Sequence, residues 1–422
     1  MTIEKAERAG RTRTARTRRR DVEPKVSKQE QILAAAAQLF NAHGVGAVGL
    51  ADLSKALGLS RATVYHYVAD REDLVFRCYQ RSCAAETEWL DRAEAAAPGL
   101  PRVLRYLEES LGEEAKRTAV ITDIGLLSPG PREIITRDVR RNYERLAAMI
   151  GEGIRLGNIR PCDEQLIARV LPSMVAFYRV SGQWVEAERD IENVAAILDF
   201  VAWGSATDRD TPFALHQSAD MFSPLQVRGL DALSVADLRI EQILMAGSKL
   251  INLRGAESLS LEDVVAALGV TRGTVYHYFN DREDLIRGCL ERGYKLYEVF
   301  MDFAERNGRD GLEKSLIITH LNTQAQAGPL QPVAAWMGGE VLDPGLRATF
   351  ADRLRKLLER SDAVAMEGIA DGTRRRVDYR PLTIARAGAF LWIPKWIDQL
   401  DNSKPHRIAD EIVGLFKSGL AV

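Results

Sequence analysis

Residues 57–67 read LGLSRATVYHY, and residues 268–278 repeat them as LGVTRGTVYHY. The offset of 211 positions holds without a gap from Glu30–Leu74 to Glu241–Leu285, and 24 of the 45 aligned residues are identical. Chance would leave only a few identities, so the chain carries a duplicated module. Such a repeat decides the architecture of the whole chain, because each copy must form the same local structure.

The first copy predicts three short helices. Apolar residues within 29–42 recur at the three- and four-residue spacing of an amphipathic helix, and Gly44 follows where a helix C-cap favours glycine. A second helix is expected over 50–57, followed by a turn at Gly58 and a third helix from Arg61. Two short helices joined by a glycine turn form a helix-turn-helix.

The second copy repeats this order, and capping residues support it. Ser60 and Thr271 stand at the N-cap of the third helix in the two copies, where a hydroxyl satisfies free backbone N–H groups. Ser260 with Asp263 resembles a capping box for the second helix of the second copy. Helical periodicity continues to the end of each half, without sustained period-two alternation in the sequence, so we expect an all-α fold.

Weaker similarity extends beyond the module, as between residues 152–154 and 367–369, which both read EGI. The chain therefore divides into two tandem units of about 200 residues each. We predict a basic arm at 1–26, a helix-turn-helix domain at 27–74, a helical regulatory domain at 75–204, a linker at 205–235, a second helix-turn-helix domain at 236–285 and a second helical regulatory domain at 286–422.

The two runs that carry most of the identity, 57–68 with 71–74 and 268–279 with 281–285, resemble the TetR family of bacterial regulators. The resemblance implies two TetR-like units, each with an N-terminal helix-turn-helix domain and a C-terminal helical ligand-binding and dimerisation domain. The chain departs from the family at Arg71 and Arg282, where lysine is usual, and the positive charge is kept.

The family resemblance further implies DNA contacts from both copies. Residues expected to face base edges are Arg61, Ala62, Thr63, Tyr65, His66, Arg272, Gly273, Thr274, Tyr276 and His277. Residues expected to hold phosphates are Ser60, Tyr67, Arg71, Thr271, Tyr278 and Arg282. The side-chain chemistry agrees, because arginine pairs bidentately with guanine and a threonine methyl packs on thymine. The alternative for the four tyrosines is that they are core aromatics.

Seven arginines lie within the first twenty residues: Arg8, Arg11, Arg13, Arg16, Arg18, Arg19 and Arg20. We favour an arm that lies along DNA or enters its minor groove. The alternative is a solvated tail, because charged runs pack poorly.

Because the family works as a homodimer, two units in one chain imply an intramolecular pseudo-dimer on a near-palindromic operator in double-stranded DNA, joined through a four-helix bundle. A dimer of chains with four modules is the rival arrangement. The family also implies a small-molecule effector between the C-terminal helices. The aromatic candidates for its pocket are Trp89, Tyr106, Phe177, Tyr178, Trp184, Trp336, Trp392 and Trp396. The alternative for each of them is ordinary helix packing.

The remaining composition favours no other class of protein. Basic and acidic residues nearly balance, at 57 against 59, and the four cysteines and six histidines show no metal-ligand spacing. No nucleophile motif or phosphate loop stands out, so we expect no enzyme, no catalytic residue, no cofactor and no metal. Without a membrane-length apolar run or a signal-peptide core, we expect a cytoplasmic bacterial protein with no membrane partner. The leading hypothesis is a ligand-responsive repressor; the alternatives are a constitutive DNA-binding protein or an activator whose C-terminal domains only dimerise.

Overall fold

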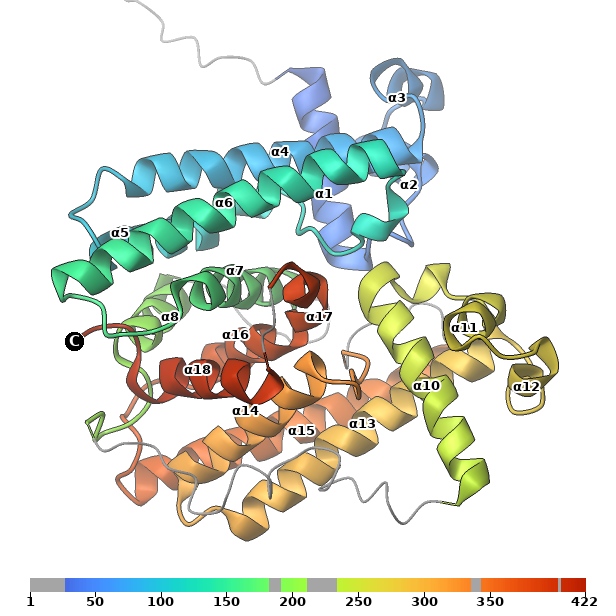
Figure 1. The fold of residues 1–422 in the computed structure, drawn as a ribbon. Helices are drawn as coiled ribbons and strands as arrows, with labels where there is room; N and C mark the ends of the chain where they lie inside the picture. Colours follow the sequence, from blue (N-terminus) through green and yellow to red (C-terminus); the bar gives the residue numbers. More distant parts are fainter. Residues whose placement is uncertain (1–26, 182–190, 211–233, 335–342, 401–403) are drawn as a thin grey trace, which may run out of the picture.

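The computed structural model describes residues 27–181, 191–210, 234–334, 343–400 and 404–422 (Figure 1). Within these ranges the regular structure is helical and no strand is formed, so the all-α prediction is confirmed. The first half comprises α1 (Lys28–His43), α2 (Leu50–Leu57), α3 (Arg61–Tyr67), α4 (Arg71–Ala93), α5 (Leu100–Leu111), α6 (Pro129–Leu156), α7 (Glu164–Val180) and α8 (Ile191–Trp203). The second half comprises α10 (Val235–Arg254), α11 (Leu261–Leu268), α12 (Arg272–Tyr276), α13 (Arg282–Asn307), α14 (Gly311–Ala327), α15 (Pro344–Ala370), α16 (Arg380–Leu391), α17 (Ile393–Trp396) and α18 (Pro405–Ser418).

The helices of each module begin and end where local chemistry dictates. Gly44 ends α1 with its N–H on the carbonyl of Phe40. Gly58 ends α2 with φ of 62°, a left-handed conformation in which glycine avoids a Cβ clash. The turn that follows sets the angle between α2 and α3, so the helix-turn-helix arises from residues close together in the sequence.

The repeat also extends through the regulatory helices. Arg145 on α6 makes ion pairs with Asp91 at 2.7 Å and Glu94 at 2.6 Å, both near the C-terminal end of α4. The second half repeats this pattern between α15 and α13, where Arg360 pairs with Asp302 at 2.6 Å and Glu305 at 2.8 Å. The two units therefore share their helix packing as well as their N-terminal modules.

The two units meet at a four-helix core, in which α7 and α8 of the first half pack against α16 and α18 of the second (Figure 1). The backbones of α7 and α16 approach so closely that a Cβ added to Gly388 would lie 2.5 Å from the Ser173 carbonyl oxygen. The tail that follows α18 also contacts the first half, since Arg160 donates its backbone N–H to the Leu420 carbonyl at 2.9 Å. The predicted four-helix bundle within one chain is therefore present.

The domain boundaries need refinement. The predicted ends of the two DNA-binding modules, 74 and 285, fall inside the continuous helices α4 and α13. The first residues of the predicted linker pack against the second half, where the backbone N–H of Ser205 donates to the Phe416 carbonyl at 2.9 Å. The rest of that linker, 211–233, and the predicted basic arm at 1–26 lie outside the described residues. In the described part of the chain, each helix is too short or too polar to cross a membrane.

Candidate nucleic-acid interface and ligand cavity

The first recognition helix, α3, exposes most of the side chains assigned to DNA. Its N-cap Ser60 accepts the backbone N–H of Thr63 at 3.1 Å, as expected. Val64 is fully buried and anchors the helix, whereas Tyr65 is 56% exposed. The exposed members of the predicted set are Ser60, Arg61, Ala62, Tyr65 and His66, and the half-buried ones are Thr63, Tyr67 and Arg71. The core-aromatic alternative is therefore wrong for Tyr65, while Tyr67 does pack against the core of the module.

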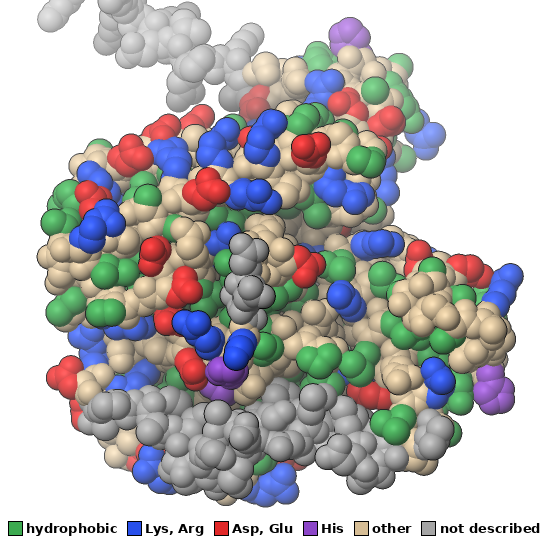
Figure 2. Space-filling view, in the orientation of Figure 1, with side chains coloured by type: hydrophobic (Ala, Val, Ile, Leu, Met, Phe, Trp, Pro, Cys, Tyr) green, Lys and Arg blue, Asp and Glu red, His purple; other side chains and the backbone are tan. Residues whose placement is uncertain are grey.

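The second recognition helix, α12, is shorter but presents the same face. Tyr276 is 36% exposed and Val275 is fully buried. The exposed members are Thr271, Arg272, Gly273, Tyr276 and His277, and the half-buried ones are Thr274, Tyr278 and Arg282. Both α3 and α12 project on the right-hand side of Figure 1, away from the four-helix core. Basic and acidic side chains are interspersed over the face drawn in Figure 2, so this face shows no large patch of a single charge.

The cap predicted at Thr271 does not form as expected. Thr271 occupies the N-cap position of α12, but its side chain accepts no backbone N–H. Its hydroxyl lies 2.9 Å from the Thr274 hydroxyl instead. The capping box of α11 is present, since Ser260 and Asp263 exchange side-chain and backbone hydrogen bonds.

The two arginines assigned to phosphates make hydrogen bonds within the module. The Arg71 guanidinium donates to the carbonyls of Val45 at 2.7 Å and Gly46 at 2.8 Å, in the loop between α1 and α2. Arg282 donates to the Ala256 carbonyl at 3.1 Å in the equivalent loop. Both side chains hold the start of the long helix against the module, and their contact with phosphate stays a prediction.

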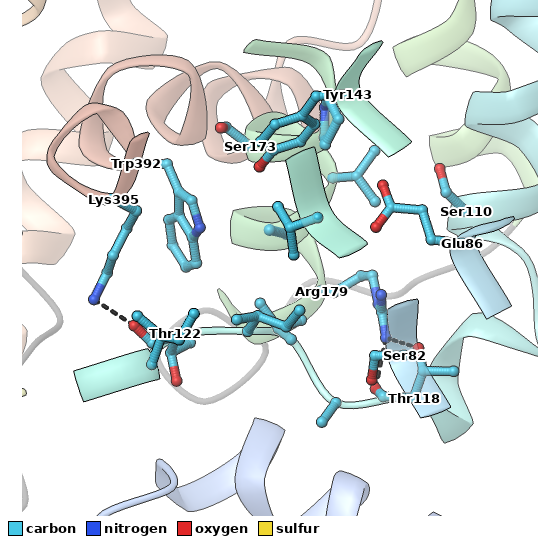
Figure 3. A pocket seen from close by; sticks show the side chains of 18 of the residues that line it. Ser82, Glu86, Ser110, Thr118, Thr122, Tyr143, Ser173, Arg179, Trp392 and Lys395 are labelled. Carbon is cyan, nitrogen blue, oxygen red and sulfur yellow. Dashed lines mark hydrogen bonds between the residues drawn. The ribbon is translucent and has the colours of Figure 1, made fainter. Parts of the chain in front are cut away.

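A cavity of about 170 Å³ lies inside the first regulatory domain (Figure 3). Helices α4, α5, α6 and α7 and the 118–124 loop line it, and Trp392 and Lys395 of the second half border the side opposite Glu86. The cavity is therefore built by both units. Its polar lining includes Glu86, Ser110, Tyr143 and Arg179, whose side chains point toward the same space (Figure 3).

Glu86 is the most unusual group in this cavity. Burial raises the pKa of its carboxyl, and a hydrogen bond from the Tyr106 hydroxyl at 2.7 Å opposes part of that rise. Glu86 is half-buried as a residue and lines the cavity. Arg179 donates to the carbonyl of Thr118 at 2.7 Å and contributes positive charge near Glu86. The cavity thus combines apolar walls and hydroxyl groups with the Glu86 carboxyl, the Arg179 guanidinium and, at its border, the Lys395 ammonium.

The aromatic candidates for the pocket divide into three groups. Trp89, Tyr106 and Trp392 line the cavity. Phe177, Tyr178 and Trp396 do not line it; they are buried in the helix packing. The ring of Phe177 packs edge-to-face on Trp392 at 6.1 Å, and the Trp396 indole N–H donates to the Ser173 hydroxyl at 3.1 Å, so both fill the contact between the halves. Trp184 and Trp336 lie outside the described residues.

Sequence analysis did not single out Glu86, although the repeat contains a signal for it. The offset of 211 aligns Glu86 with Tyr297 and Trp89 with Phe300 on the uninterrupted helices α4 and α13. Because Tyr297 and Phe300 lie on the apolar face of their helix, a glutamate at the position that aligns with Tyr297 is expected to point inward as well. The second half contains an equivalent but more apolar cavity of about 120 Å³, lined in part by Tyr297, Leu354 and Leu358.

The 118–124 loop touches both the cavity and the first module. Asn41 on α1 donates to the Thr118 carbonyl at 2.9 Å and accepts the Val120 N–H at 2.8 Å. The second unit repeats this contact, because Asn252 on α10 donates to the Pro332 carbonyl at 3.0 Å and accepts the Ala334 N–H at 3.3 Å. One asparagine in each module therefore hydrogen-bonds to a loop of its regulatory domain.

A polar junction joins the same loop to the second unit. The Lys395 ammonium donates to the Thr122 carbonyl at 2.5 Å and lies 3.8 Å from the Asp123 carboxylate. Burial lowers the pKa of Lys395, and Asp123 opposes this shift. Nearby, the Glu257 side chain of the second module lies against Gly46 of the first. The two modules therefore contact each other beside the cavity loop.

Comparison with known proteins identifies the duplicated module. A family model described as bacterial regulatory proteins of the tetR family matches residues 32–78 and again 243–289. The uncharacterized HTH-type transcriptional regulator YhgD of Bacillus subtilis is 24% identical over 185 residues, covering 41% of this chain and 94% of that protein. The HTH-type transcriptional repressor LfrR of Mycolicibacterium smegmatis is 24% identical over 161 residues, covering 38% and 80% respectively.

The TetR family regulator PfmR from Thermus thermophilus matches with a TM-score of 0.35 and 24% identity, covering 42% of this chain and 96% of PfmR. AibR in complex with isovaleryl coenzyme A and operator DNA matches with a TM-score of 0.36 and 19% identity, covering 42% of this chain and 98% of AibR.

Two helix-turn-helix modules with exposed recognition helices, fused to helical domains, define a DNA-binding transcription regulator. The DNA-binding module of the tetR family of bacterial regulatory proteins is present twice, so the chain is a tandem of two units that each resemble a regulator of that family.

Proposed function

We propose that this chain is a small-molecule-responsive repressor that acts as a single-chain pseudo-dimer on a near-palindromic operator. The observation that carries the proposal is the 118–124 loop, which lines the cavity and hydrogen-bonds to Asn41 of the first DNA-binding module. The relative LfrR, itself described as a transcriptional repressor, supports the sign of regulation.

DNA recognition is assigned to the exposed faces of α3 and α12. Arg61, Tyr65 and His66 in the first unit, with their counterparts in the second, would reach base edges in successive major grooves. Ser60 and Tyr67 offer hydroxyl groups of the kind that contact phosphate oxygens and fix the register on DNA. The four-helix core would hold the two recognition helices at one spacing, as subunit contacts do in a dimer.

Effector binding is assigned to the cavity at Glu86. A ligand there would displace or brace the 118–124 loop, and the loop would pass the change to α1 through Asn41 and to the second unit through Lys395. An effector then changes DNA affinity because it binds the two arrangements of the modules unequally.

The stoichiometry of the DNA complex tests the pseudo-dimer. The full chain is mixed with a site selected from random DNA, and light scattering after chromatography gives the mass of the free protein and of the complex. One chain on one near-palindrome supports the proposal. Two chains per site would favour four modules acting together, and failure to select any sequence would refute specific recognition.

Effector coupling is tested with Asn41→Ala and its counterpart Asn252→Ala. A library of cationic, anionic and neutral amphiphiles is first screened for compounds that release DNA and change the fluorescence of the cavity tryptophans. For any such compound, Asn41→Ala should bind the ligand and DNA separately but lose most of the release. Asn252→Ala is the matched comparison, since it breaks the equivalent contact to the second regulatory domain, away from the Glu86 cavity.

A constitutive DNA-binding protein is the alternative reading. It predicts that no compound of the library releases DNA, although cavity ligands are found by fluorescence. An activator would bind the same operator and respond to ligand, but transcription from a reporter would rise with the protein present. The reporter assay with and without the chain separates activation from repression.

A further inference from the structure

One exposed position differs sharply between the two modules. Residue 51 on α2 is alanine, whereas its counterpart on α11, residue 262, is glutamate. Both occupy the second position of the helix that precedes the recognition helix. The substitution therefore places a carboxylate beside the DNA-facing side chains of the second module alone.

Glu262 ties together two residues of the second recognition helix. Its Oε1 accepts the Tyr276 hydroxyl at 2.6 Å and lies 2.9 Å from Nη2 of Arg272. The same Nη2 donates to the Tyr276 hydroxyl oxygen at 3.0 Å, and the guanidinium stacks over the tyrosine ring at 4.7 Å from its centroid. These contacts raise the pKa of Arg272 and lower that of Glu262, through the hydrogen bonds to Tyr276 first.

The first module holds its equivalent residues differently. Arg61 and Tyr65 are exposed, and within the described residues neither side chain makes a hydrogen bond or an ion pair. Ala51 offers them no polar group. Arg61 can therefore turn both ends of its guanidinium toward a base, whereas one end of Arg272 is engaged.

We propose that Glu262 makes the second recognition helix read its half-site differently from the first. Bidentate recognition of guanine needs two aligned guanidinium N–H groups. Because Nη2 of Arg272 is held by Glu262 and Tyr276, the second module discriminates less for guanine at the base pair that Arg61 reads in the first half-site. The operator is then asymmetric at that base pair, although the two recognition helices otherwise differ only at Ala62 and Gly273 over residues 61–67 and 272–278.

The inference rests on the proposed DNA-binding role of α3 and α12. A structural alternative also exists, because an acidic residue in the first turn of α11 favours the positive end of the helix dipole. That role predicts a change in stability but no change in base preference. The two roles are therefore separated by measuring which base is preferred, in addition to affinity and thermal stability.

The experiment uses the full chain and two reciprocal variants, Glu262→Ala and Ala51→Glu. Glu283→Ala is the control, since it removes an exposed carboxylate of the same module that makes no hydrogen bond or ion pair within the described residues. DNA is selected from random sequence for each protein. Binding is then measured on sites that differ only at the base pair assigned to the arginine, in one half-site at a time.

Glu262→Ala should make the selected site symmetric at that base pair and strengthen binding to a palindrome of the first half-site by about three- to tenfold, the range expected for losing an exposed ion pair and the hydrogen bond from Tyr276. Ala51→Glu should weaken binding to that palindrome by a similar factor. Glu283→Ala should select the wild-type site. Equal base preferences in wild type and Glu262→Ala would overturn the inference, as would equal weakening on all sequences in Ala51→Glu. If the wild-type chain selects no DNA, the proposed function itself fails.

Discussion

Gly388 is the position at which the contact between the two units can be tested most directly. A methyl group added there would lie 2.5 Å from the Ser173 carbonyl oxygen, 2.6 Å from Cβ of Phe177 and 3.0 Å from Cα of Met174. These atoms belong to the α7 backbone or sit directly on it, so side-chain rotation cannot relieve the clash. Ordinary van der Waals contact begins near 3.4 Å, so α7 and α16 must part by about 0.9 Å.

The stability effect of Gly388→Ala combines two terms of opposite sign. Replacing a helix glycine by alanine gains up to about 1 kcal/mol from helix propensity. Overpacking a close contact costs about 1–3 kcal/mol. Gly151→Ala on α6 is the matched control, because its added methyl meets only flexible side chains at ordinary contact distances, Arg155 at 3.4 Å and Glu164 at 3.9 Å. The difference in free energy of unfolding between the two variants therefore isolates the clash.

The assay is urea unfolding followed by tryptophan fluorescence, with operator binding measured in parallel. Trp392 and Trp396 lie at this contact and report on it directly. We expect Gly388→Ala to be less stable than Gly151→Ala by about 1–3 kcal/mol and to prefer an operator with altered half-site spacing. Equal stabilities together with an unchanged preferred spacing would refute the view that the α7–α16 crossing sets the distance between the modules.

Three further changes test other parts of the structure. Glu241→Ala removes the carboxylate that pairs with the buried Arg292 at 2.8 Å, so we expect it to lower the free energy of unfolding in urea by about 3–5 kcal/mol. Glu30→Ala removes the equivalent, more exposed pair and should cost about 0–1 kcal/mol. Equal costs would contradict this assignment. Burial raises the pKa of Glu86 above its ordinary value of 4.5, so the folded protein binds this proton more tightly than the unfolded chain does. The resulting contribution to stability is complete below pH 4.5 and is lost as the pH rises through the folded-state pKa. Glu86→Gln should therefore be more stable than wild type near pH 7, with the gain vanishing toward pH 4, and a gain independent of pH would count against a buried titrating carboxyl. Gly273→Ala meets no atom within 4 Å and should stabilise the short helix α12 by up to about 1 kcal/mol, as circular dichroism on heating would show; a loss of stability would imply a contact that the structure does not contain.

The helix-turn-helix modules could be predicted almost to the residue because their determinants are local. Gly58 and Gly269 end their helices in the left-handed conformation, and Ser60 caps the next helix as expected. These features depend on a few adjacent residues, and the repeat allowed each of them to be checked twice. The failed cap at Thr271 shows the limit, since its hydroxyl had a second partner, Thr274, one turn away.

The cavity was harder to predict because its residues come together only in the packed chain. Trp89 and Trp396 carry the same apolar signal in the sequence, yet one lines the cavity and the other fills the contact between the halves. The position of a side chain relative to a cavity depends on helix crossing geometry, which apolar periodicity does not specify. Lys395 and Asp123 are separated by more than half the chain, so sequence proximity could not relate them.

Covalent fusion changes what the repeat can evolve to do. In a homodimer, one substitution alters both subunits, so both recognition helices and both ligand cavities must change together. Here Glu262 faces only the second recognition helix, and Glu86 lies in only one cavity, since its counterpart is Tyr297. The contacts within each unit are also retained, including the repeated ion pairs of Arg145 with Asp91 and of Arg360 with Asp302. The structure therefore keeps symmetry in the helix packing within each unit and departs from it at Glu262 and Glu86. This is the pattern expected if one chain has replaced a dimer, and it supports the proposed difference between the two half-sites.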